Sequence, residues 1–134
     1  IGEGDLEAEI LNTAKELGVD DKVILLHNQK NIEDYYQAMD VFVMPSFYEG
    51  MPNTVIEAQA SGLPCFISNT VTTDVGISEQ VHYLPINQGV EPWVNEVVST
   101  VLERKNVLEK IKQAGFDIKD TSKWLMELYT ALGE

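Results

Sequence analysis

The stretch that decides the fold is Glu49-Gly50-Met51-Pro52-Asn53-Thr54-Val55-Ile56-Glu57, which places two carboxylates eight positions apart. The apolar run Val41-Phe42-Val43-Met44 precedes it and stops at Pro45, and Gly62 closes the segment that follows. This order predicts a buried strand, a loop, and a helix that starts at about Thr54. Ligands of open parallel sheets bind at the carboxyl ends of the strands, so we expect both acids at a binding edge.

Two local explanations compete with a binding role for these acids. Thr54 and Glu57 have the spacing of a capping box, in which each side chain accepts a hydrogen bond from the other residue's backbone amide. Glu49 lies in a loop, where an acid is usually only solvated. Their arrangement around one helix start nevertheless favours a ligand, because free amides and the positive end of the helix dipole attract an anionic group such as a diphosphate.

In the rest of the chain, segments with the apolar spacing of helices alternate with short apolar runs typical of strands. The predicted helices and strands are, in order, helix 6–17, strand 23–26, helix 32–39, strand 41–44, helix 54–61, strand 65–67, strand 82–84, helix 92–102 and helix 121–132. Helices that alternate with short, continuously apolar strands indicate a parallel sheet covered on both faces. The predicted fold class is therefore α/β, a Rossmann-like three-layer α/β/α sandwich in one domain that spans residues 1–134.

Composition and charge narrow the classes of function. The chain has 134 residues, of which 44% are hydrophobic and 23% charged, as expected for a globular domain with its own core. Its nine Lys and Arg are outnumbered by 22 Asp and Glu, giving a net charge of −13 that excludes nucleic acid as a partner. No apolar run approaches the roughly 20 residues that cross a bilayer. Without a visible leader, the expected location is cytoplasmic.

Cysteine, histidine and glycine patterns predict no cofactor. Cys65 is the single cysteine and lies in an apolar run, so we expect a buried, reduced thiol. His27 and His82 are isolated from other ligand types, and the carboxylates lack metal-ligand spacing, so no metal site is expected. Gly2-Glu3-Gly4 lacks the third glycine of a dinucleotide fingerprint.

The block around the two acids resembles a known family. Phe47–Pro52 together with Glu57–Pro64 is similar to the E-x7-E signature of retaining nucleotide-sugar glycosyltransferases of family 4, which have the two-domain GT-B fold. Tyr35–Ser46 is similar to that family's lead-in, and Ile67–Val75 resembles its bacterial exopolysaccharide and capsule branch. The resemblance extends from Gly2 to about residue 102 and is strongest over residues 34–68.

The resemblance implies that this chain is the donor-binding, C-terminal half of a GT-B enzyme, truncated at its N-terminus. The N-terminal acceptor domain would be absent, as would a preceding Arg and Lys that clamp the diphosphate, so the chain alone is expected to be inactive. The implied partners are a nucleotide-sugar donor, with a UDP-sugar preferred, and a glycan or lipid-linked acceptor held by the missing domain. The full-length protein would then act at the inner face of the membrane.

The resemblance also implies a role for individual residues. Glu49 would contact the transferred sugar, and Glu57 would accept both ribose hydroxyls of the nucleotide. The turn Gly50-Met51-Pro52 would bring the backbone close to the donor, and the amides near Asn53, Thr54 and Val55 would hold the diphosphate. The loop His27-Asn28-Gln29 would offer backbone groups to the base. In this family the departing phosphate itself helps to deprotonate the acceptor, so no metal and no protein nucleophile are required.

One loop departs from the family pattern. Many relatives have Gly-Gly-x-Pro-Glu after the strand equivalent to 65–67, whereas Thr72–Glu79 has no glycine pair and no proline before its glutamate. We therefore expect Glu79 to be a solvated surface acid. Trp124 and Tyr129, near the end of the chain, are expected to be packing residues.

Three other functions remain open on the sequence. A non-catalytic relative would keep the nucleotide site without turnover. A glycoside hydrolase also uses two carboxylates, although their spacing across a turn and a helix start fits it less well. A flavodoxin-like interaction domain would explain the strands but not the block around Glu49. The sequence leaves open the sugar, the base, the acceptor and the oligomeric state.

Overall fold

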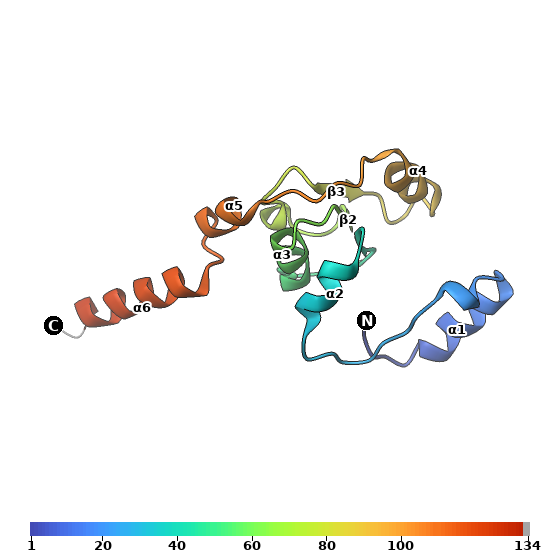
Figure 1. Cartoon of the computed structure of the whole chain (residues 1–134), viewed down its shortest axis with the longest axis horizontal. Helices are drawn as coiled ribbons and strands as arrows, with labels where there is room; N and C mark the ends of the chain where they lie inside the picture. The colour runs from blue at the N-terminus through green and yellow to red at the C-terminus, as the bar shows by residue number, and fades with distance from the viewer. Residues whose placement is uncertain (133–134) are drawn as a thin grey trace. The chain divides into compact units, whose positions relative to one another are not determined.

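The computed structural model describes residues 1–132. The chain divides into two compact units, Ile1–Ile32 and a larger unit from Glu33 onward. The first unit contains helix α1 (Glu7–Glu16) and the 3-10 helix η1 (Asp20–Lys22) (Figure 1). Gly18 takes a left-handed backbone conformation with φ +66° directly after α1, and its amide donates to the Lys15 carbonyl at 3.0 Å. Glycine adopts this conformation without strain, so the predicted helix stop is confirmed.

The predicted strand at 23–26 is wrong, because this segment has no regular secondary structure. In the described residues its backbone forms one hydrogen bond with a distant segment of the same chain, from the Gly2 amide to the Leu26 carbonyl at 2.8 Å. Ile24 is 81% exposed, against the burial that an apolar run suggests. A strand requires a paired neighbour along its length, and hydrophobicity alone cannot supply one.

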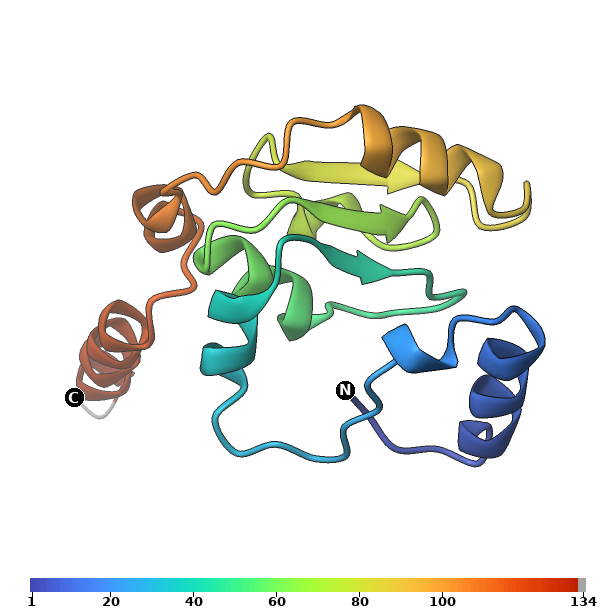
Figure 2. The same ribbon diagram turned by 45° about the vertical axis from the view of Figure 1, so that its right-hand side comes forward.

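The larger unit is built on a parallel sheet. Strands β1 (Phe42–Met44), β2 (Cys65–Ser68) and β3 (Val81–Leu84) lie in the order β1-β2-β3, and all three point the same way in Figure 2. Phe42 pairs with Cys65, and Phe66 pairs with His82. All four residues of β2 are buried, which is the environment of a central parallel strand.

Helices cover both faces of this sheet. The ring of Tyr36 in α2 (Ile32–Ala38) lies 6.1 Å from that of Phe42 on one face. Trp93 of α4 (Glu91–Ser99) packs with Phe66 and Leu84 on the other face. Phe42 and Phe66 point to opposite faces of the sheet. Phe42 pairs with Cys65 and shares its face, whereas Phe66 is the next residue of the strand and points to the other side. The predicted three-layer α/β/α arrangement is confirmed.

Helix α3 (Asn53–Ala60) connects β1 to β2 and is the best-buried helix of the unit. It ends at Gly62, which has φ +79°, as the sequence predicts. A Cβ atom at this position would also lie 2.8 Å from the Lys105 carbonyl oxygen. Both the backbone conformation and the close approach therefore require glycine here.

The last third of the chain differs most from expectation. The predicted helix 92–102 ends at Ser99, because Thr100 is extended, and its hydroxyl donates to the Glu96 carbonyl at 2.7 Å. Helix α5 (Leu108–Gln113) was not predicted, and α6 (Ile118–Leu132) begins three residues early. A 3-10 helix, η2 (Thr73–Val75), lies between β2 and β3.

Trp124 and Tyr129 are not packing residues in the described part of the chain. They are 59% and 70% exposed, and α6 contains no buried side chain. Apolar spacing along a helix predicts an amphipathic surface but does not specify what covers it.

Candidate functional site

The loop that follows β1 is held at the carboxyl end of the sheet by two hydroxyl groups. The Ser46 carbonyl accepts a short hydrogen bond from the Ser68 hydroxyl, at the end of β2, and another from the Thr70 hydroxyl at 2.9 Å. Ser68 is fully buried. The start of the loop is thereby fixed to the central strand, so its later residues project from a defined position.

Glu49 lies on the exposed part of this loop. Its carboxylate accepts a hydrogen bond from the Ser46 hydroxyl at 2.8 Å, and the same hydroxyl lies 3.2 Å from the Tyr48 carbonyl. A hydroxyl has one proton, so these two acceptors share or alternate it. Tyr48 is 90% exposed beside the acid. Glu49 is therefore accessible to a ligand and has a local orienting partner.

Helix α3 begins without a side-chain cap, and the predicted capping box is wrong. Pro52, which is buried, occupies the N-cap position, and the helix starts at Asn53. Thr54 therefore lies inside the first turn, where its hydroxyl faces the Met44 sulfur at 3.9 Å. In the described residues the Asn53 and Thr54 amides donate to no protein group, whereas the Val55 amide donates to the Pro52 carbonyl at 3.1 Å. The helix start keeps two free donors.

Glu57 lies one turn further along α3 and is an exposed residue. Instead of a capping partner it has Tyr36, whose hydroxyl donates to Glu57 Oε2 at 3.1 Å. Tyr36 is only 3% exposed. Burial, with the added effect of the Glu57 carboxylate, raises the pKa of the Tyr36 phenol far above its ordinary value. The phenol therefore remains a proton donor at neutral pH.

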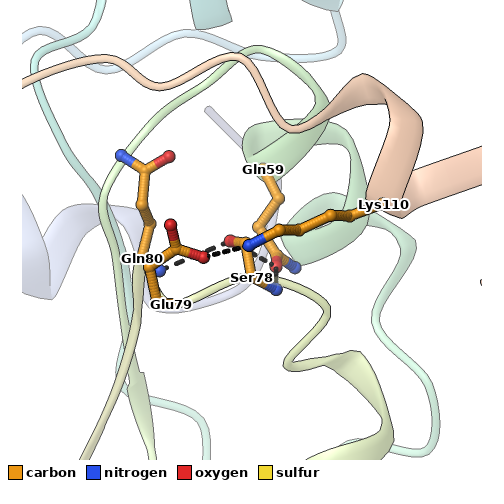
Figure 3. A network of polar contacts seen from close by, with 5 residues as sticks. All are labelled: Gln59, Ser78, Glu79, Gln80 and Lys110. Carbon is orange, nitrogen blue, oxygen red and sulfur yellow. Dashed lines mark hydrogen bonds and ion pairs between the residues drawn. The ribbon is translucent and has the colours of Figure 1, made fainter.

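A buried glutamine anchors the helix that carries Glu57, and the sequence analysis missed it. Gln59 is fully buried, and its amide nitrogen donates to the Val75 carbonyl at 2.7 Å. Its carbonyl oxygen accepts from the Ser78 amide at 3.0 Å and the Ser78 hydroxyl at 3.1 Å, as Figure 3 shows. The available signal was a polar residue between Ala58 and Ala60, on the apolar side of a helix. This network joins α3 to the loop that departs from the family pattern.

Glu79, in the same loop, is exposed as predicted but is also paired. Its carboxylate lies 2.5 Å from the Lys110 ammonium of α5 (Figure 3). The hydrogen bond from Lys110 lowers the pKa of Glu79 below its ordinary value. Nothing in this contact points toward the loop after β1, so Glu79 is a surface ion-pair residue.

The predicted base-binding loop belongs to the first unit. His27 Nε2 lies 3.0 Å from Glu7 Oε2, and the Asn28 amide donates to the Glu3 carboxylate at 3.4 Å. The Gln29 side chain donates to the His27 carbonyl at 3.0 Å. These contacts join the loop to α1 and to the glycine-flanked Glu3. The roles of His27, Asn28 and Gln29 toward a base stay predictions.

Cys65 is a buried free thiol, as predicted, and burial raises its pKa to about 12. Within residues 1–132, no three His, Cys, Asp or Glu side chains gather closely enough to hold a metal ion. No helix in the same range has the length and apolarity needed to cross a membrane.

Comparison with known proteins identifies the family. The sequence model described as "Glycosyl transferases group 1" matches residues 1–112, which include both glutamates and all three strands. The chain belongs to this family. The resemblance to a glycosyltransferase family is therefore confirmed, together with the α/β fold.

Several bacterial proteins are similar to this family member over most of its length. "Putative glycosyltransferase EpsF" of Bacillus subtilis (strain 168) is 33% identical over 134 residues, covering 96% of this chain. An Escherichia coli protein named UDP-Gal:alpha-D-GlcNAc-diphosphoundecaprenol alpha-1,3-galactosyltransferase is 28% identical over 96% of the chain. "Vi polysaccharide biosynthesis protein VipC/TviE" of Salmonella typhi is 39% identical over 75% of it. The chain spans 35%, 35% and 16% of these relatives.

Proposed function

We propose that this chain is the donor-binding domain of a retaining glycosyltransferase that builds a bacterial surface polysaccharide. The enzyme transfers a sugar from a nucleotide-sugar, preferably a UDP-sugar, to a glycan or lipid-linked acceptor. The acceptor binds mainly to a domain outside this chain, and transfer takes place on the cytoplasmic side of the membrane.

The observation that carries the proposal is the uncapped start of α3 between two exposed carboxylates. The Asn53 and Thr54 amides are available to the diphosphate, and the helix dipole favours negative charge at the same point. Glu49 precedes this helix start and Glu57 follows it. A nucleotide-sugar has the matching order of groups, with hydroxyls of the sugar and of the ribose on either side of a diphosphate.

The relatives support the choice of donor and acceptor. The name of the Escherichia coli protein specifies a UDP-sugar donor and an acceptor on diphosphoundecaprenol, a lipid carrier. The names of other relatives refer to Vi polysaccharide and amylovoran biosynthesis. Both names belong to bacterial biosynthesis proteins, and one of them specifies a polysaccharide, so a donor site of this family fits the same type of pathway.

Each residue at this site has a separate task in the proposed reaction. Glu57 accepts hydrogen bonds from the ribose hydroxyls and fixes the nucleotide. The Asn53 and Thr54 amides stabilise negative charge as the diphosphate departs, which is the main electrostatic contribution to the rate. Glu49 bonds the transferred sugar and holds it against the acceptor hydroxyl. The proton of that hydroxyl passes to the departing phosphate.

Calorimetric titration of the chain with UDP, GDP and ADP tests the nucleotide site. Charge-assisted hydrogen bonds are worth roughly 1.5–3 kcal/mol each. Glu57→Ala removes two of them and should weaken UDP binding by roughly 150-fold or more. The matched control is Glu127→Ala, because Glu127 is an exposed acid on helix α6 and does not belong to the proposed site. This control should leave binding unchanged.

The Glu57→Gln variant separates a ligand role from a structural one. It keeps an acceptor for the Tyr36 hydroxyl but removes the charge that the ribose hydroxyls would contact. Weakened UDP binding with an unchanged melting temperature supports the proposal. A wild-type chain that binds no nucleoside diphosphate, or a Glu57→Ala variant that binds as wild type does, overturns it.

A further inference from the structure

We propose that Tyr36 is a positioning residue for the nucleotide, acting through its hydrogen bond to Glu57. Its buried hydroxyl holds the Glu57 carboxylate in the orientation that receives the ribose. This inference rests on the proposed function and adds a residue outside the signature that contains both acids.

The first support is the difference in burial between Tyr36 and its partner Glu57. Tyr36 is buried and comes from α2, whereas Glu57 comes from α3 and is exposed. A buried phenol needs a hydrogen-bond partner, and Glu57 Oε2, at 3.1 Å, is its partner in the described residues. Glu57 is the flexible member of this pair, so the bond restricts the acid more than it restricts the tyrosine.

The Tyr36 ring cannot easily move away from this position. It packs against the Phe42 ring of β1 with the centroids 6.1 Å apart and the planes tilted by 60°. Phe42 is itself in register with Cys65 of the buried strand β2. The hydroxyl is therefore presented from a fixed point of the core to a carboxylate at the surface.

The bond leaves Glu57 able to bind a ligand. Tyr36 contacts Oε2, and Oε1 has no protein partner within residues 1–132. A carboxylate has two oxygens and about four acceptor positions, so two ribose hydroxyls can still be received. Because the phenol stays protonated at neutral pH, it donates to Glu57 whether or not the nucleotide is present. The acid is ordered before binding, which lowers the entropy lost when the ligand arrives.

Arg104 fixes the two helices that carry this pair. Its guanidinium donates to the Tyr36 carbonyl at 2.8 Å and the Met39 carbonyl at 2.5 Å, at the end of α2. It also donates to the Ser61 carbonyl at 2.7 Å, directly after α3. Cations are favoured at helix C-termini, where carbonyl groups lack partners. One side chain thus joins α2 to α3 and maintains the spacing between Tyr36 and Glu57.

The test compares the binding of UDP and of 2′,3′-dideoxyuridine diphosphate to the Tyr36→Phe variant. Phenylalanine keeps the ring and removes only the hydroxyl. UDP binding should weaken about 5- to 10-fold, as expected for loss of one orienting hydrogen bond. Binding of the dideoxy compound should change less than twofold, because it has no ribose hydroxyls for Glu57. A merely structural effect would weaken both ligands equally and would overturn the inference.

Three further variants make the result decisive. Tyr83→Phe is the matched control, because Tyr83 donates only to backbone carbonyls near Thr73 and should leave both affinities unchanged. Tyr36→Phe combined with Glu57→Ala should bind UDP no more weakly than Glu57→Ala alone. If Tyr36→Phe fails to fold, Arg104→Gln provides the second route, and it should also reduce UDP binding more than dideoxy binding.

The same data distinguish failure of this inference from failure of the proposed function. If Glu57→Ala loses UDP binding while both Tyr36→Phe and Arg104→Gln keep the wild-type preference for UDP, only the positioning role is wrong. If the wild-type chain does not distinguish UDP from the dideoxy compound, Glu57 does not bind the ribose, and both proposals are overturned.

Discussion

The two signature glutamates are supported in different ways. Glu57 lies on α3, which is anchored from inside by fully buried Gln59, and its carboxylate is bonded to the buried phenol of Tyr36. Glu49 lies on an exposed loop, and its partner is the hydroxyl of Ser46 three residues earlier in the chain. One acid is therefore held by the core of the unit, and the other by its own loop.

Under the proposed function, this difference matches each acid to one part of the ligand. A carboxylate fixed by buried groups is adapted to a constant partner, and the ribose is present in every nucleotide-sugar. A carboxylate on a loop can adjust, which suits the transferred sugar, the part of the donor that varies within a family. Loops positioned by a rigid scaffold commonly carry such specificity.

The largest effect is expected from removing the internal anchor of α3. Gln59→Leu would remove the acceptor of both the Ser78 amide and the Ser78 hydroxyl, which are buried. An unsatisfied buried group costs roughly 1–3 kcal/mol, so the free energy of unfolding should fall by about 2–6 kcal/mol. Urea denaturation followed by circular dichroism measures this change.

Gln88→Leu is the control for this comparison, because Gln88 is exposed. It should change the free energy of unfolding by less than about 0.5 kcal/mol. If Gln59→Leu is equally mild, α3 does not depend on its buried network, and the contrast between the two glutamates loses its basis.

A smaller effect is expected at the loop that carries Glu49. Ser46→Ala removes the hydroxyl that donates to Glu49, at a net cost of roughly 0.5–1.5 kcal/mol for one hydrogen bond. Binding of a UDP-sugar recognised by the chain should weaken about 2- to 10-fold, while binding of UDP alone should stay constant. Isothermal titration with both ligands measures the two affinities.

Ser99→Ala serves as the matched control, because Ser99 donates only to the Glu96 carbonyl of its own helix. It should affect neither ligand. Equal weakening of UDP and UDP-sugar by Ser46→Ala would show that Glu49 is not a sugar contact.

The smallest effect is expected from changing the pH around neutrality. Tyr36 has its pKa raised above the ordinary 10.0, first by burial and then by Glu57. Its bond to Glu57 should therefore persist from pH 6 to pH 9, with no change in UDP affinity that depends on this phenol. The unfolded chain releases this proton first as the pH rises above about 10, so the contribution of Tyr36 to stability is lost only in strong alkali.

Tyrosinate absorbance during an alkaline titration tests this expectation. The chain has five tyrosines, so the titration of Tyr36→Phe is subtracted from that of the wild type. The difference should ionise well above pH 10 in the folded protein and near pH 10 in urea. An ordinary pKa in the folded state would contradict the buried, Glu57-bonded phenol.

The sequence was most informative where local pattern and tertiary structure agree. The strand at 41–44, the stop at Gly62 and the buried Cys65 follow from apolar runs and from a required positive φ, which are properties of short segments. The family followed from a block of residues in register. Each of these features depends on neighbours in the chain.

Features that depend on distant partners were not predictable in this way. The segment 23–26 is apolar but lacks a paired strand, and α6 is amphipathic but has no buried side chain in the described residues. The same applies to the site. The capping box, one of the alternatives for Glu57, would have bonded it to the Thr54 amide, but its partner is Tyr36, 21 positions away. Sequence spacing identified the acids but not the groups that orient them.

The position of Arg104 has a practical consequence for defining the smallest folded piece of this domain. All residues of the family signature lie before residue 65, so a version of the chain shortened to residue 100 would retain every one of them. It would nevertheless lose Arg104, the only arginine in the sequence, and with it the hydrogen bonds that join the ends of α2 and α3. The minimal domain is therefore longer than its motif, and its boundary lies beyond Arg104.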